Sequence, residues 1–196
     1  MLRRRRLPLF LLAITLTVGL CAAGCLFSPD KTGPPPIPPP EIPPPTSPAN
    51  LIKAIEVIYN DKVRSASERL VAYDSLFAPG FLFYLQPVDQ EHGLPPSWGF
   101  ATEHESHDGI FHAQDDGRIY SLTLSIVHDP ARDLYPPEEG REGWKEVFAT
   151  NVNLRLLYNP NDGLEVNGGQ GRYKMFQVSP PTGRWYIGEW IDLPRP

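Results

Sequence analysis

The chain has 196 residues, with 18 basic and 23 acidic side chains and a net charge of −5 at pH 7. This balance lacks the basic footprint with which proteins bind nucleic acid or anionic lipid head groups. Both cysteines lie within the first 25 residues, so we expect no disulfide framework and no zinc-thiolate site in the rest of the chain.

The N-terminus has the three parts of an export signal. Four arginines precede an apolar stretch from Leu7 to Leu20, and small residues then lead to a cysteine. The string AAGC, which ends at Cys25, resembles the lipobox of bacterial lipoproteins. The resemblance implies cleavage between Gly24 and Cys25 and attachment of acyl chains such as palmitate to Cys25. We therefore predict a lipoprotein signal peptide over residues 1–24.

Lipidation would decide where the mature protein lies. Acyl chains on Cys25 would bind it to a lipid bilayer, and stable anchoring needs two chains or more. Leu26 follows the cysteine where Asp would favour retention in the inner membrane, so resemblance to lipoprotein sorting favours the outer membrane, facing the periplasm, in bacteria with two membranes. Without residues 1–24 the net charge is −9. The alternative is an uncleaved anchor, because the apolar stretch through Phe27 is long enough to span a bilayer.

Residues 25–47 read as the lipidated N-terminus followed by a proline-rich linker. Ten of the 24 prolines lie between Pro34 and Pro48. Because proline fixes φ and removes a donor, this run favours extended polyproline II and a disordered, semi-rigid stalk. A ligand for a proline-recognition groove is the rival interpretation.

Residues 48–196 have the size of one domain, and its first part is predicted to be helical. Ser47-Pro48 provides an N-cap and a first-turn proline for a helix that runs to about residue 62. Ser65 or Ser67 caps a second helix, which Ala78-Pro79-Gly80 ends. The apolar run Phe81 to Leu85 then predicts a buried strand.

The second part of the domain alternates with the period of strands. The alternation predicts four strands and hence an α+β domain in which helices precede an antiparallel meander. In two of them one face is apolar, formed by Tyr120, Leu122, Leu124 and Ile126 and by Val152, Leu154, Leu156 and Tyr158. The strands are expected near residues 120–126, 148–158, 171–178 and 184–193.

This order resembles the nuclear-transport-factor-two-like superfamily. The resemblance rests on SPANLIKAIEVIYNDK as the first helix, ERLVAYDSLFAPGFLFYL as a helix running into a strand, and RWYIGEWIDL as the final strand, with Gly188 at a bulge. It implies helices packed in a strongly bent, cone-like antiparallel sheet. The chain is also similar to bacterial lipoproteins that place such a domain behind a lipobox and a proline-rich stalk.

The superfamily includes ketosteroid isomerases, dehydratases, polyketide cyclases and domains without activity. Its enzymes place a carboxylate or histidine base and a Tyr or acid donor inside an apolar cone. No motif here matches those catalytic sets residue by residue, so we predict no catalytic residue and no cofactor. Asp74, in the second helix, is expected to face solvent or to cap locally.

The stretch ATEHESHDGIFH, residues 101–112, holds three of the five histidines. HESH lacks the HExxH spacing of zinc proteases, so no metal is predicted, although His104, His107 or Asp108, and His112 would be its ligands if there were one. We expect a short helix capped by Thr102 and interrupted at Gly109, with Ile110 and Phe111 packed on the sheet. Near the mouth of the cone, we predict that the ligand-binding residues are Trp98, His104, His107, Tyr120 and Trp144.

Two functions follow from these features. The first is a membrane-tethered envelope lipoprotein, without enzymatic activity, whose domain binds a small apolar ligand or another envelope component. The alternative is a lyase or isomerase of the ketosteroid isomerase kind that uses a buried carboxylate or His104. The sequence leaves the oligomeric state open.

Overall fold

The structure is a computed structural model that describes residues 36–91, 93–178 and 183–194. Its contacts divide the chain into two units, Met1–Ile37 and Pro38–Pro196. The predicted signal peptide, Cys25 and the first part of the proline-rich linker lie outside the described residues. In the part of the chain that is described, no helix has the length and apolar character needed to cross a membrane.

The first two helices begin where the sequence predicts. Helix α2 (Pro48–Asn60) is capped by Ser47, whose side chain accepts from the Asn50 amide, and has proline in its first turn. Helix α3 (Ala66–Asp74) begins with a capping box formed by Ser65 and Glu68. Both N-cap predictions are confirmed.

The predicted end of the second helix is wrong. Strand β1 (Phe77–Tyr84) already begins at Phe77, before Ala78-Pro79-Gly80, and Phe77 is in register with Ile187 of the last strand. Backbone pairing with a distant strand therefore overrides the helical spacing of Leu76 and Phe77.

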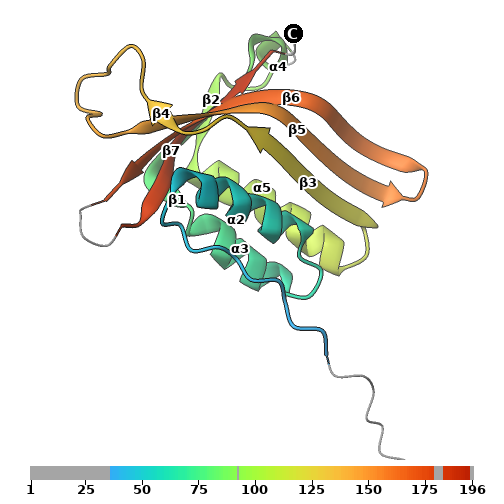
Figure 1. The fold of residues 1–196 in the computed structure, drawn as a ribbon. Coiled ribbons are helices and arrows are strands. Elements are labelled where there is room, and N and C mark those ends of the chain that lie inside the picture. The colour runs from blue at the N-terminus through green and yellow to red at the C-terminus, as the bar shows by residue number, and fades with distance from the viewer. Residues whose placement is uncertain (1–35, 92, 179–182, 195–196) are drawn as a thin grey trace, which may run out of the picture. The chain divides into compact units, whose positions relative to one another are not determined.

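A seven-stranded sheet follows, in the order β2-β1-β7-β6-β5-β3, with the short β4 paired to β5. Figure 1 shows the sheet curving over α2, α3 and α5, which lie together against one face. This confirms the predicted α+β class with helices packed in a curved sheet. The remaining elements are α4 (Pro87–Glu91), α5 (Phe100–Asp115), β2 (Ser97–Gly99), β3 (Ser121–His128), β4 (Arg132–Asp133), β5 (Lys145–Asn159), β6 (Asp162–Gln177) and β7 (Trp185–Leu193).

One pairing departs from the antiparallel pattern. Strands β1 and β7 pair in parallel, and every other pair is antiparallel. The last strand of the chain thus inserts between β1 and β6. A parallel pair needs a long connection, which the helices and the other strands provide.

The core lies between the helices and the sheet. Leu51, Ile55 and Ile58 of α2 are fully buried, as the helical spacing predicts, and Leu122 of β3 faces them from the sheet side of the core. Tyr120 and Tyr158, which were expected on the apolar faces of their strands, are instead exposed. Tyr120 precedes the first residue of β3 and Tyr158 is the last but one residue of β5, so both lie at the ends of their strands.

The predicted bulge at Gly188 is confirmed. Lys174 pairs with Glu189 and Met175 with Ile187, so that Gly188 is an extra residue in β7. A Cβ atom at this position would lie 2.5 Å from Cη2 of Trp144, which is too close for any side chain. Glycine therefore allows the Trp144 ring to lie directly on the backbone of β7.

Side chains of α2 bond backbone groups of β3, the strand at one edge of the sheet. Asn60 bonds the edge strand β3 twice, because its Nδ2 donates to the Leu124 carbonyl at 2.8 Å and its Oδ1 accepts from the Leu124 amide at 3.1 Å. Glu56 accepts from the Ile126 amide at 2.6 Å. These bonds occupy backbone groups that a further strand would otherwise pair with.

Residues just before α2 also pack on the folded unit. The Pro40 carbonyl accepts from Arg64 at 2.8 Å, the Pro45 carbonyl accepts from the Trp185 amide at 2.8 Å, and Ile42 packs against the core. The C-terminal end of the proline-rich segment, from Pro40 to Pro45, thus packs on the domain.

Candidate functional site

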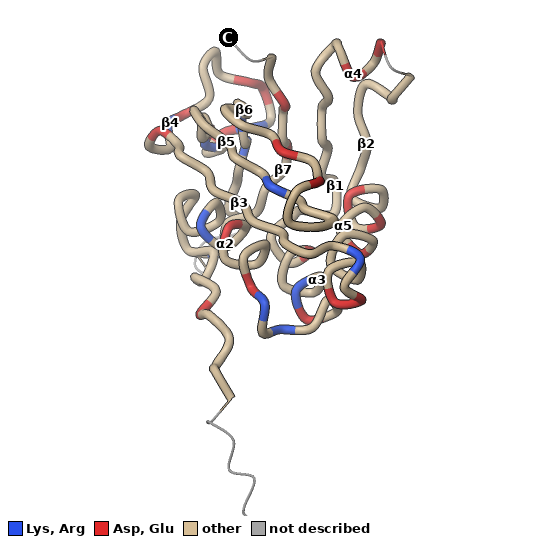
Figure 2. Tube along the Cα trace, turned by 90° about the vertical axis from the view of Figure 1, so that its right-hand side faces the viewer, with Lys and Arg blue, Asp and Glu red and all other residues tan. Residues whose placement is uncertain are grey.

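Helix α5 (Phe100–Asp115) contains the histidine-rich stretch and places its side chains on two faces, one buried and one exposed. It runs without interruption from Phe100 to Asp115, so the predicted break at Gly109 is wrong. Its N-cap is Gly99, so the predicted cap at Thr102 is wrong as well. Because the helix continues, residues four apart share a face. Figure 2 shows acidic residues along this helix, whereas basic residues gather near the turn between α2 and α3.

The inner face of α5 carries a buried polar cluster. The Glu103 carboxylate accepts from the Tyr73 hydroxyl at 2.7 Å and from Trp98 Nε1 at 2.7 Å. His107 Nδ1 donates to the Glu103 carbonyl at 2.9 Å, which leaves Nε2 to accept from the Tyr59 hydroxyl. The Tyr73 ring stacks on His107 with ring centroids 4.0 Å apart. The spacing of Glu103, His107 and the fully buried Phe111 therefore directs them into the core.

Burial decides the protonation of this cluster. It raises the pKa of the Tyr59, Tyr73 and Tyr173 hydroxyls, and the nearby Glu103 charge raises all three further. It lowers the pKa of His107, although the Glu103 charge acts in the opposite direction. The tyrosines thus remain neutral donors. The Tyr173 hydroxyl is buried and has no hydrogen-bond partner within the described residues.

The outer face of α5 contributes to a recess against α3, which we call the α3–α5 recess. His104 Nδ1 lies 2.7 Å from Asp74 Oδ2, and the side chain of His104 is 45% exposed. The Phe100 ring lies 6.3 Å from the His104 ring. The recess has a volume of about 650 Å³ and is lined by Asp74, Phe100, Ala101, His104, Glu105 and Asp108.

The expectation for Asp74 was wrong, because Asp74 neither points freely into solvent nor caps its own helix. It bonds a histidine 30 residues away. Its other oxygen, Oδ1, is buried and has no partner among the described residues. The helical period placed Asp74 and His104 correctly on helices, but nothing in it connects the two.

The five predicted ligand-binding residues lie in different places. Trp98 and His107 belong to the interior cluster and are connected through Glu103. His104 lies in the α3–α5 recess. Tyr120 and Trp144 line two further recesses, apart from these. Their role as ligand contacts stays a prediction.

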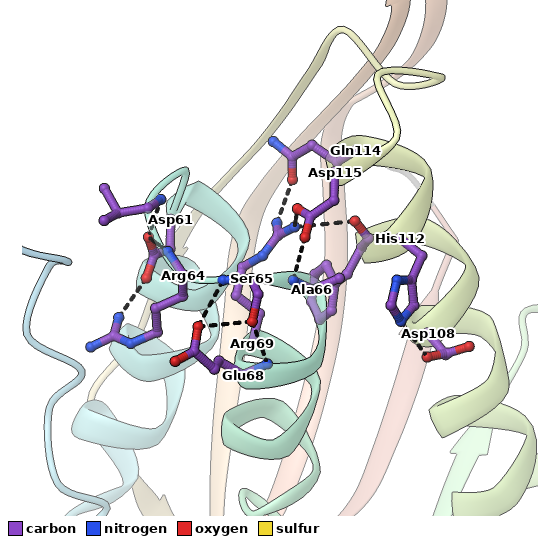
Figure 3. A network of polar contacts seen from close by, with 12 residues as sticks. Asp61, Arg64, Ser65, Ala66, Glu68, Arg69, Asp108, His112, Gln114 and Asp115 are labelled. Atoms are coloured by element: carbon purple, nitrogen blue, oxygen red, sulfur yellow. Dashed lines mark hydrogen bonds and ion pairs between the residues drawn. The ribbon is translucent and has the colours of Figure 1, made fainter.

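Tyr120 lies in a recess of about 640 Å³ between the α2–α3 turn and the end of α5. Figure 3 shows the polar network formed by the α2–α3 turn, α3 and the end of α5. The buried Arg69 donates to Asp115 at 2.7 Å, to the Phe111 carbonyl at 3.1 Å and to Gln114. Its guanidinium also lies over the Phe111 ring. Through these contacts Arg69 joins α3 to α5.

Trp144 lies in the segment between β4 and β5. Its ring stacks on Phe176 with centroids 4.5 Å apart, and the Arg141 guanidinium lies 4.9 Å from it. Arg141 in turn bonds Glu138 at 2.6 Å and also Glu189 of β7. The ring and the ion pairs together fasten this segment to the sheet.

Metal chemistry has no candidate site in the described part of the chain, where no three His, Cys, Asp or Glu residues are grouped closely enough to hold an ion. On α5, His112 Nε2 lies 3.3 Å from Asp108, while His104 is bonded to Asp74. His107 points to the opposite face, into the core. The histidines of the stretch therefore do not converge on one point.

Because the buried His107 is neutral, we expect acid to lower the free energy of unfolding. Burial lowers the pKa of His107 in the folded state. In the unfolded chain the same side chain has its ordinary pKa of about 6.5 and therefore binds a proton at a higher pH. The free energy of unfolding should therefore fall as the pH decreases below about 6.5, by at most about 1.4 kcal/mol per pH unit from this group. Urea unfolding at pH 5.0, 5.5, 6.0, 6.5 and 7.5 measures the slope.

The comparison variant is His107→Gln, which should flatten the slope between about pH 5 and 6.5. His128→Gln is the control, since His128 Nδ1 bonds the carbonyl of the adjacent Asp129 at an exposed site. The pKa of Glu68, lowered by the Ser65 amide, and that of Glu138, lowered by Lys174, affect stability only at more acidic pH. An unchanged slope in His107→Gln would contradict the assignment.

No protein-family model matches the sequence, and no curated protein matches it. Similar solved structures include one from Novosphingobium aromaticivorans that its name assigns to scytalone dehydratase, with 10% identity, a TM-score of 0.49 and coverage of 74% of this chain and 78% of that chain. An NTF2-like protein of unknown function in nutrient uptake from Rhodospirillum rubrum has 13% identity, a TM-score of 0.45 and coverage of 74% and 94%.

A ketosteroid isomerase-like protein from Erwinia carotovora atroseptica has 10% identity, a TM-score of 0.41 and coverage of 65% and 82%. Likeness at such identities concerns the arrangement of helices and strands and says nothing about an active site.

Proposed function

We propose that the protein is a membrane-tethered lipoprotein of the bacterial envelope whose domain binds a small, mainly apolar ligand in the α3–α5 recess. The observation that carries the binding site is the composition of this recess. An aromatic ring, Phe100, lies beside a hydrogen-bonding pair, Asp74 and His104, in an open volume of about 650 Å³. Ligand sites combine apolar walls with a few placed polar groups in this way.

The interior cluster fits a structural role better than a binding role. Each polar group of Glu103, His107, Tyr59 and Tyr73 is bonded to another group of the protein. All four side chains are buried. None lines any of the four recesses described on the surface of the resolved residues. A ligand would have to break these bonds before it reached them.

The tether is tested in bacterial cells that express the full chain. Cys25→Ala should carry no acyl chains and should be either released from the membrane fraction or left unprocessed, because the acyl chains supply the anchoring free energy of the mature protein. Cys21→Ala is the matched control and should leave the protein in the membrane fraction. Mass spectrometry of the N-terminal peptide should show acyl chains on Cys25. A wild-type N-terminal peptide without acyl chains on Cys25 would contradict the tether.

The recess is tested with N-phenyl-1-naphthylamine, an apolar dye whose fluorescence rises on transfer out of water. Titration of the dye into the protein should give a saturable increase in fluorescence. Ala101→Trp should abolish it, because the added ring fills the recess that Ala101 lines. Ala131→Trp places the same ring on an exposed position outside it and should leave the binding unchanged. Equal binding by both variants would place the dye elsewhere.

An acid–base enzyme is the second candidate function, and one observation favours it. The Tyr173 hydroxyl is buried without a hydrogen-bond partner among the described residues. Burial raises its pKa, and the charges of Asp192 and Glu103 act in the same direction. A carboxylate, a histidine and tyrosines together can move protons. Turnover of any component of a metabolite extract, followed by mass spectrometry and lost in Glu103→Gln, would support this candidate over the first.

A further inference from the structure

The bond between Asp74 and His104 determines what the exposed nitrogen of the imidazole can do. A carboxylate oxygen accepts, so the His104 Nδ1 that lies 2.7 Å from Asp74 Oδ2 carries the hydrogen. In the neutral ring the other nitrogen, Nε2, is then an acceptor. His104 is 45% exposed and lines the α3–α5 recess, so this acceptor is available to a ligand there.

The other polar side chains of the recess are acceptors as well. Asp74, Glu105 and Asp108 are carboxylates, and neither Lys nor Arg lines the recess. An anionic ligand would meet like charge there, whereas a group that donates a hydrogen bond would meet only acceptors. The apolar part of the lining is Phe100 and Ala101.

We infer that the ligand is a neutral, ring-containing molecule with a hydroxyl group, which donates to His104 Nε2 while the ring packs on Phe100. The inference rests on the proposed function, because it assumes that the α3–α5 recess is the binding site. Asp74 is a positioning residue in this scheme, since it fixes the tautomer of His104 and does not itself touch the ligand.

Three naphthalenes of similar size provide the test. 2-Naphthol donates a hydrogen bond, 2-methoxynaphthalene only accepts one, and 2-naphthoate is an anion. Binding to the protein at pH 8 is measured by chemical-shift titration. We expect 2-naphthol to bind about three- to tenfold more tightly than 2-methoxynaphthalene, the effect of one neutral hydrogen bond, and 2-naphthoate to bind most weakly.

Two variants identify the groups responsible. His104→Phe keeps a ring but removes the acceptor, so the two neutral probes should bind equally well. Asp74→Asn should lower or reverse the preference for 2-naphthol, because an amide at this position can donate to Nδ1 and so place the hydrogen on Nε2. Asp108→Asn makes the same change of charge in the recess without touching His104, and the preference should persist.

A measurement without ligand supports or contradicts the tautomer directly. Two-bond ¹H–¹⁵N spectra should show a protonated Nδ1 and an unprotonated Nε2 for His104 in the wild type, and the reverse would overturn the inference. Thermal unfolding of each variant confirms that it is folded.

The outcomes separate this inference from the function beneath it. If none of the three naphthalenes binds, or if Ala101→Trp leaves their binding unchanged, the α3–α5 recess is not the site and the proposed function fails. If they bind there with equal affinity, the recess stands as a site but the hydroxyl inference fails. Tightest binding of 2-naphthoate would also overturn it and would assign the uncapped first turn of α5 as the polar contact.

Discussion

Arg69→Met is expected to lower the free energy of unfolding by about 3 kcal/mol. Arg69 is 1% exposed, and its guanidinium bonds Asp115 and the Phe111 carbonyl of α5 from α3. Methionine keeps much of the apolar stem but leaves these acceptors without their donor. Asp115, which is 38% exposed, can return to water, so the cost lies at the lower end of the range for a broken buried pair. Urea unfolding measures the loss.

The control for this variant is Arg118→Met. Arg118 pairs with Asp116 at 3.1 Å, but both side chains are more than half exposed. A pair in water contributes at most about 1 kcal/mol and often nothing measurable. Equal losses in the two variants would show that burial of the Arg69 network adds nothing to the docking of α3 on α5.

Glu103→Leu is expected to lower the free energy of unfolding by about 3 kcal/mol as well. The substitution leaves the Tyr73 hydroxyl, which is fully buried, and Trp98 Nε1 without their acceptor. Each buried donor without a partner costs about 1–3 kcal/mol, and the greater apolar character of leucine offsets part of this. Differential scanning calorimetry and urea unfolding measure the effect.

Glu105→Leu is the matched control, two residues along α5 on an exposed position, and should change stability by no more than about 0.5 kcal/mol. Glu103→Leu should also bind the naphthylamine dye as the wild type does, since the recess lies on the other face of α5. A neutral or stabilising Glu103→Leu would show that the core prefers apolar packing to this cluster.

Local features of the fold could be predicted from the sequence, and long-range ones could not. Ser47 and Ser65 cap helices because their side chains reach amides two or three residues away, which a short window of sequence contains. The parallel pairing of β1 with β7 depends on how the whole chain closes, which no such window contains. The alternation of residues along a strand predicts which side chains face the core, but it does not predict which strand lies beside it.

The same limit applies to the candidate site. Asp74 and His104 are 30 residues apart, and Arg69 and Asp115 are 46 apart, so neither bond leaves a signal in the spacing of residues. Gly109 is a different case. Its local tendency to interrupt a helix was visible in the sequence, but the folded protein overrides it. A glycine costs a helix about 1 kcal/mol, whereas burial of Phe111, two residues later, contributes more.

The contacts of Asn60 and Glu56 with β3 have a consequence for neighbouring copies of the protein. Under the lipid anchoring proposed above, molecules on one membrane would meet one another far more often than the same number free in solution. An open sheet edge would then recruit edges of other molecules, and assembly would grow strand by strand. With Leu124 bonded through both its amide and its carbonyl, that edge offers an incoming strand an incomplete row of partners. Under the proposed lipid anchoring, strand-by-strand pairing at the β3 edge is therefore disfavoured.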